Sequence, residues 1–157
     1  MAKQPHIIIF NPDEMRGDAL AHLGNPASIT PNLDAFAANE AVSFGQAYCQ
    51  NPVCVPSRCS FFTGLYPHVR GHRTMSHLLR PGETSMLKEL KEAGYYVWMN
   101  DRNDLTAGQI PGWTESHATE IYYSGQKKQG PGNVNPDQRG EPGNKYYYSH
   151  YEGQLKC

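Results

Sequence analysis

The chain has 157 residues, of which 38% are hydrophobic, with a formal net charge of -1 and a mean hydropathy of -0.66. This length is enough for one domain with a hydrophobic core. Lys and Arg are scattered along the chain without forming a stripe, so the charge pattern favours no nucleic-acid partner. The first apolar run, Ile7–Phe10, is too short for a membrane span or a signal-peptide core. We therefore expect a cytoplasmic protein that does not bind membranes, unless a leader has been removed.

The first predicted element is a strand over His6–Phe10, a continuous β-branched and aromatic run typical of strands buried on both faces. It ends before Pro12, which cannot donate to a strand ladder. Asp13 and Glu14 follow at once. Open α/β folds place their ligands at the carboxyl ends of parallel strands. The sequence therefore predicts ligand-binding carboxylates directly after this strand.

The rest of the first 100 residues alternates between helical and extended patterns. Helix starts are indicated by Thr or Ser with Pro in the first turn, and helix ends by Gly. In chain order we predict a helix from Thr30-Pro31, a short extended segment over Val42–Tyr48, a helix over Ser57–Thr63 before Gly64, a helix over Thr84–Ala93 before Gly94, and a strand over Tyr95–Met99. This alternation indicates an α/β protein.

The composition changes after Ser124. Gly125–Gly143 consists mainly of Gly, Pro, Gln, Lys and Asn, and a tyrosine-rich segment over Tyr146–Tyr151 follows. We predict an α/β segment over residues 1–124 and a surface loop or extension over residues 125–157, because the latter has little to bury. The alternative is that its tyrosines dock on a partner or on a further part of the fold.

The most specific motif lies in the middle of the chain. Cys54-Val55-Pro56-Ser57-Arg58 is followed by Thr63-Gly64 and by Tyr66-Pro67-His68. This segment resembles the signature of type I, formylglycine-dependent sulfatases of the alkaline phosphatase-like superfamily, and we identify the chain as the N-terminal part of such a protein. The resemblance implies an α/β fold, the N-terminal portion of a mixed sheet flanked by helices, which we expect to be incomplete. Taken alone, Cys54 would be interpreted as a structural cysteine.

The resemblance also implies a mechanism. A maturation enzyme that reads Pro56 and Arg58 would oxidise Cys54 to formylglycine, whose hydrate has two hydroxyls. One would attack sulfur while a divalent cation polarises the sulfate, and the other would lose its proton to expel sulfate. Independently of the family, Pro56 at a helix start places residue 54 beside N–H groups that favour an anion, with Arg58 one turn on. Cys54 and Arg58 are therefore predicted catalytic residues.

A second motif, Asp13-Glu14-Met15-Arg16-Gly17-Asp18, is similar to the N-terminal metal motif of the same family. It implies that Asp13, Glu14 and the converted Cys54 bind a divalent cation, with Ca²⁺ expected and Mg²⁺ or Mn²⁺ as alternatives. Hard cations need several oxygen ligands, so these three residues alone would leave the cation under-coordinated. Glu14 stands where the family usually has Asp or Gln.

A third segment departs from the family, which has Gly-Lys-x-His where this chain has Asp101-Arg102-Asn103-Asp104. Arg102 is predicted to be catalytic by binding sulfate in place of the lysine. Asp104 replaces the histidine, although a carboxylate cannot substitute for an imidazolium that faces an anion. Three other histidines could serve instead, each otherwise interpreted as a surface loop residue: His68, His72 and His77. Cys49 and Cys59 are interpreted as small buried hydrophobic residues.

Together these patterns predict a sulfuric ester hydrolase that acts on a small sulfate ester and depends on a formylglycine-generating maturation enzyme. The departure at Asp104 leaves a phosphonate or phosphate ester hydrolase as an alternative. Because the sequence offers too few ligands for the cation, a further alternative is a truncated non-catalytic fragment, or a subunit whose fold is completed by a companion chain.

Overall fold

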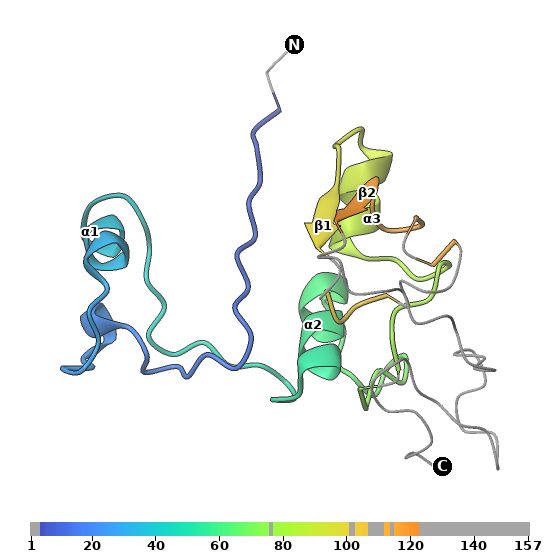
Figure 1. Ribbon diagram of the computed structural model, residues 1–157. Coiled ribbons are helices and arrows are strands. Elements are labelled where there is room, and N and C mark those ends of the chain that lie inside the picture. Colours follow the sequence, from blue (N-terminus) through green and yellow to red (C-terminus); the bar gives the residue numbers. More distant parts are fainter. Residues whose placement is uncertain (1–3, 76, 101–102, 107–111, 114, 123–157) are drawn as a thin grey trace. The chain divides into compact units, whose positions relative to one another are not determined.

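The computed structural model describes residues 4–75, 77–100, 103–106, 112–113 and 115–122 (Figure 1). They fall into two compact units that divide between Tyr48 and Cys49. The first unit contains a 3-10 helix, η1 (Ala21–Leu23), and helix α1 (Pro31–Asn39). The second contains helices α2 (Cys54–Thr63) and α3 (Met86–Glu92) and strands β1 (Trp98–Asn100) and β2 (Glu120–Tyr122).

In the first unit, the helix predicted from Thr30-Pro31 is confirmed as α1, with Pro31 as its first residue. Thr30 occupies the N-cap position, but its hydroxyl donates to the Asp34 side chain at 2.9 Å. The same Asp34 oxygen accepts a hydrogen bond from the His22 backbone N–H at 3.1 Å, which connects α1 to η1. Polar contacts therefore hold this unit together, and none of its described residues is fully buried.

The predicted strand over His6–Phe10 is wrong. Residues 6–10 have no regular secondary structure, and Ile8 and Phe10 are about nine-tenths exposed. Val42–Tyr48 likewise forms no strand. A strand of this apolar pattern needs a hydrogen-bonded neighbour and a covering layer on each face, and no described residue pairs with either segment.

The second unit contains the hydrophobic core. α2 contributes Val55, Cys59 and Phe62, which pack with buried residues from α3, β1 and the connecting segments: Leu78, Leu79, Leu87, Val97, Met99, Leu105, Trp113 and Ala118. Cys59 is fully buried, as predicted, whereas Cys49 is exposed and its predicted burial is wrong. The core therefore lies directly behind the helix that carries the Cys-x-Pro-Ser-Arg motif.

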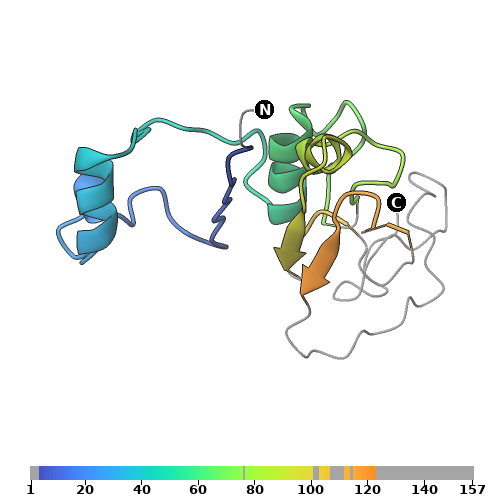
Figure 2. The ribbon, with the colours of Figure 1, turned by 90° about the horizontal axis from the view of Figure 1, so that it is seen from above.

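The helix predicted over Thr84–Ala93 is confirmed as the shorter α3, and the strand predicted over Tyr95–Met99 is confirmed as β1, which begins three residues later and ends one residue later. α3 begins after Ser85, whose hydroxyl accepts from the Lys88 N–H at 3.1 Å, and Gly94 follows it in a left-handed conformation. β1 runs parallel to β2, with Met99 opposite Ile121 (Figure 2). The described residues thus form an α/β arrangement with a two-stranded parallel sheet, and the larger mixed sheet predicted from the sequence is not seen in them.

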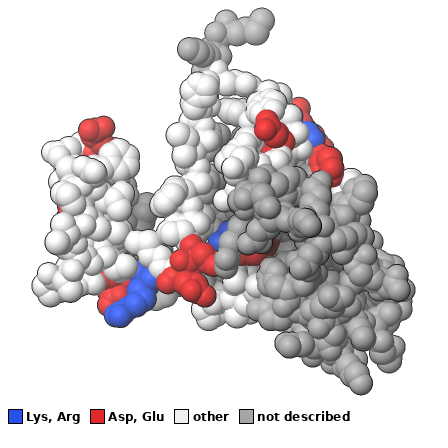
Figure 3. All heavy atoms as spheres, in the orientation of Figure 1, with Lys and Arg blue, Asp and Glu red and all other residues white. Residues whose placement is uncertain are grey.

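Charged side chains of both signs lie next to one another on the face shown in Figure 3, and the described residues form no extended basic patch there. Two ion pairs among the described residues are Arg16–Asp18, which is exposed, and Lys88–Glu92, in which Lys88 is partly buried. Among the described helices, none is long and apolar enough to cross a membrane. The predicted extension over residues 125–157 lies outside the described residues.

Candidate active site

The site is built on the first turn of α2. Cys54 is the first helical residue, and Val53 precedes it in an extended conformation. The first backbone hydrogen bond of the helix runs from the Ser57 N–H to the Val53 carbonyl at 2.9 Å. The N–H groups of residues 54 and 55 precede that bond, and Pro56 has none. Cys54 therefore lies at the positive end of the helix dipole, as the sequence predicts.

Arg58 lies one turn further along α2. Its Nε atom is 3.8 Å from Oδ2 of Asp104, and its Nη1 donates to the Asn103 carbonyl at 3.3 Å. Only 11% of the Arg58 side chain and 7% of the Asp104 side chain are exposed. These contacts connect α2 to the loop that follows β1.

That loop is shaped by the buried side chain of Asn103. Its Oδ1 accepts from the N–H groups of Leu105 and Thr106, both at 2.9 Å, and its Nδ2 donates to the Asn100 carbonyl at 3.2 Å. Asn103 thereby closes a tight turn of the kind that Asn side chains favour. The next residue, Asp104, adopts a φ of 52°, a left-handed conformation that Asp tolerates better than most residues.

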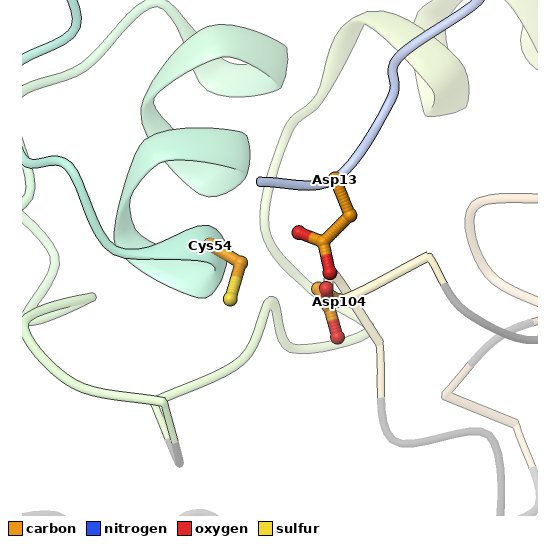
Figure 4. Close-up of side chains that lie close together, drawn as sticks. All are labelled: Asp13, Cys54 and Asp104. Carbon is orange, nitrogen blue, oxygen red and sulfur yellow. The ribbon is translucent and has the colours of Figure 1, made fainter. Parts of the chain in front are cut away.

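The turn brings Asp104 close to Cys54 (Figure 4). A carboxylate oxygen of Asp104 and Sγ of Cys54 lie within 4.8 Å of each other. The thiol donates to Sδ of Met75, with a sulfur–sulfur distance of 3.4 Å. The second unit therefore gathers a thiol, a thioether, a guanidinium and a carboxylate at the start of α2.

The other predicted site residues belong to the first unit or lie outside the described residues. Asp13 and Glu14 belong to the first unit, where Glu14 is exposed and has a φ of 54°. Figure 4 also labels Asp13. Arg102 lies outside the described residues. Metal binding by Asp13 and Glu14 and sulfate binding by Arg102 thus remain predictions.

Two of the three alternative histidines are buried, so their interpretation as surface residues is wrong. His72 is 2% exposed, with Nδ1 2.8 Å from the His77 carbonyl and Nε2 3.4 Å from the Glu83 carboxylate. His77 is 9% exposed. The Glu83 carboxylate that faces His72 is itself buried, at 5% exposed. His68 is exposed, as predicted.

The sequence marks Asp104 only as a departure from the family pattern and does not predict its contact with Arg58 or the position of Met75 beside Cys54. One local signal was available for Asp104. An Asn-Asp pair in the loop after a strand favours an Asx turn followed by a residue in the left-handed conformation.

The family model that describes sulfatases matches residues 5–151. The chain belongs to the sulfatase family. Curated sulfatases similar to it include an ulvan-active sulfatase of Formosa agariphila, 40% identical over 59% of this chain and 18% of that protein. An arylsulfatase of Clostridium perfringens is 35% identical over 60% of this chain and 20% of that protein. Human N-acetylgalactosamine-6-sulfatase is 36% identical over 58% of this chain and 20% of that protein. The chain thus spans about a fifth of the length of these sulfatases.

Proposed function

We propose that this chain carries the nucleophile-bearing N-terminal part of a sulfuric ester hydrolase, with Cys54 as the precursor of a catalytic formylglycine. The observation that carries the proposal is the position of Cys54 as the first residue of α2, within an intact Cys-x-Pro-Ser-Arg motif and with Arg58 one turn on. A thiol could serve as a nucleophile, but it cannot supply the second hydroxyl that expels sulfate in the mechanism implied by the family.

The chain's own groups suit a sulfate ester. The N–H groups at the start of α2 and the guanidinium of Arg58 both favour an anion next to residue 54. Arg102, by its type, would add a second guanidinium. The role we assign to Arg58 is to hold a sulfate oxygen while Asp104 holds the guanidinium in place, as their 3.8 Å contact suggests.

A divalent cation would be held by Asp13, Glu14 and an oxygen on residue 54. Carboxylates fit a hard cation such as Ca²⁺, whereas the sulfur of an unconverted Cys54 does not. The cation would supply polarisation of the sulfate group. Three protein ligands fall short of the six to eight that Ca²⁺ takes, so we propose that further ligands come from protein beyond these residues or from a companion chain.

The names of these relatives mention different sulfate esters: ulvan, aryl and N-acetylgalactosamine 6-sulfates. We propose a sulfate ester as the substrate class and assign no particular alcohol to it.

The proposal is tested by intact-mass spectrometry of the chain after co-expression with a formylglycine-generating enzyme. We expect the mass change of a Cys-to-formylglycine conversion, mapped to the peptide that contains Cys54. The control is Pro56→Ala, which keeps the cysteine but alters the motif, and we expect it to lower conversion. An unmodified Cys54 in the parent chain would refute the proposal.

A second candidate is a phosphonate or phosphate ester hydrolase of the same superfamily. It is favoured by one observation, a carboxylate at Asp104 where the sulfatase pattern has a histidine. Parallel assays of the converted protein on aryl sulfate and aryl phosphonate esters, each with and without a chelator, distinguish the two. A preference for sulfate that disappears with the chelator supports the first candidate, and a preference for phosphonate supports the second.

A further inference from the structure

The Asp104 carboxylate is a buried charge whose hydrogen bonds are incomplete. The residue is 8% exposed, and its Oδ2 accepts no hydrogen bond from the described part of the chain. The Arg58 contact at 3.8 Å is an ion pair longer than a hydrogen bond. A buried carboxylate oxygen without a hydrogen-bond donor costs free energy. A donor placed next to Oδ2 would therefore be stabilising.

Cys54 is a reactive side chain close to the Asp104 carboxylate. Its sulfur lies within 4.8 Å of the Asp104 carboxylate, yet its single proton is directed to Met75. In the converted residue, one hydroxyl oxygen of the aldehyde hydrate takes the place of Sγ. The hydrate also carries a second hydroxyl on the same carbon, which the thiol lacks. One donor can thus remain near Met75 while the other reaches Asp104.

We infer that Asp104 is a binding residue for the hydrated formylglycine at position 54, whose hydroxyl donates to its free oxygen and is thereby held in the hydrated form. This inference rests on the proposed function and adds a role for the residue that departs from the family pattern. The hydrate forms when water adds across the aldehyde C=O bond, with its proton going to the carbonyl oxygen. A charge-assisted acceptor beside one hydroxyl stabilises the hydrate, because the aldehyde has no O–H to donate.

The test measures the ratio of hydrate to aldehyde at residue 54 by carbon-13 NMR of chain converted in cells that receive Cβ-labelled cysteine. The two forms differ in carbon hybridisation and resonate far apart. We compare the parent with Asp104→Asn and Asp104→Gly, both of which tolerate the left-handed backbone at this position. Replacing a charged acceptor by a neutral one should lower the ratio about fivefold in Asp104→Asn, and Asp104→Gly should lower it further.

Two controls separate this role from a general loss of stability. Glu92→Gln removes an exposed carboxylate of the same unit. Gly64→Ala strains the far end of α2 without touching the acceptor. Both should keep the parental ratio. A converted residue 54 with equal ratios in the parent and the Asp104 variants would overturn this inference alone. A chain in which Cys54 stays unconverted would overturn the proposed function and this inference together.

Discussion

Arg58 on α2 and Asp104 in the loop after β1 form a nearly buried ion pair, with Nε and Oδ2 3.8 Å apart. The pair connects the helix that presents Cys54 to the strand edge of the same unit. Because both charges are largely removed from water, each depends on the other more than an exposed pair would. The same contact therefore contributes to stability and to the arrangement of the site.

The first prediction concerns this pair. We expect Arg58→Met to lower the free energy of unfolding by about 3 kcal/mol, because it leaves the Asp104 charge buried without its partner. In the double variant Arg58→Met/Asp104→Asn the loss should be smaller than the sum of the two single losses. Urea unfolding of the parent, Arg58→Met, Asp104→Asn and the double variant measures these free energies. Additive losses would show that the two side chains do not interact energetically.

The second prediction concerns the turn that positions Asp104. Asn103→Ala removes the acceptor of two buried N–H groups, those of Leu105 and Thr106. We expect a loss of about 3 kcal/mol, since each buried donor left unpaired costs about 1–3 kcal/mol. Asn103→Ser keeps a side-chain oxygen that can accept from the Leu105 N–H in the same kind of turn, so it should cost about 1 kcal/mol less than Asn103→Ala. Equal losses in both variants, measured by urea unfolding, would contradict this account.

The third prediction concerns the end of α2. Gly64 has a φ of 70°, and a Cβ at this position would meet no atom within 4 Å. Gly64→Ala should therefore cost only the backbone strain of a left-handed residue, about 1 kcal/mol. Gly82 is equally open and does not have a positive φ, so Gly82→Ala is the matched control and should change stability by less than about 0.5 kcal/mol. Thermal unfolding of both variants provides the comparison, and equal shifts would argue against strain at Gly64.

Local signals explain what could be predicted from the sequence. The start of α2 near Cys54 follows from Pro56 in its first turn, because Pro favours that position. Its end follows from Gly64, because Gly favours the left-handed position after a helix. The same holds for Ser85 and Gly94 around α3. Both helices were accordingly predicted, although α2 begins at Cys54, three residues before the predicted start at Ser57.

Contacts between distant residues could not be predicted in this way. Arg58 and Asn103 are 45 positions apart, so no periodicity links them. His72 was interpreted as exposed because histidines in loops usually are, whereas it is buried beside Glu83, eleven positions later. The strand predicted over His6–Phe10 failed for a related reason. Its apolar pattern specifies what a buried strand needs but not whether the described residues supply a neighbour for it.

The last prediction concerns His117, which is fully buried. Its Nε2 lies 2.9 Å from the Arg80 carbonyl, which can only accept, so we assign the proton to Nε2. Its Nδ1 then accepts from the Ser85 hydroxyl at 2.8 Å. This arrangement requires a neutral imidazole, because a proton on Nδ1 would face the Ser85 hydrogen.

Burial lowers the pKa of His117 below its ordinary value of 6.5. The bond to the Arg80 carbonyl and the charge of Glu83 act in the opposite direction, while Lys88 and Lys91 add to the lowering. The unfolded chain therefore binds a proton more readily than the folded chain as pH falls below about 6.5. The stability due to neutral His117 is present above that pH and is lost on acidification, with a slope of at most about 1.4 kcal/mol per pH unit.

His117→Gln is the variant that isolates this effect. A glutamine amide can donate to the Arg80 carbonyl and accept from the Ser85 hydroxyl, but it does not titrate. Urea unfolding at intervals between pH 7.5 and about 5 should show that the parent loses stability faster than the variant as pH falls, so that their difference changes with pH. All other titrating groups are shared by the two proteins and cancel in the comparison. A difference independent of pH would mean that His117 keeps its ordinary pKa in the folded chain.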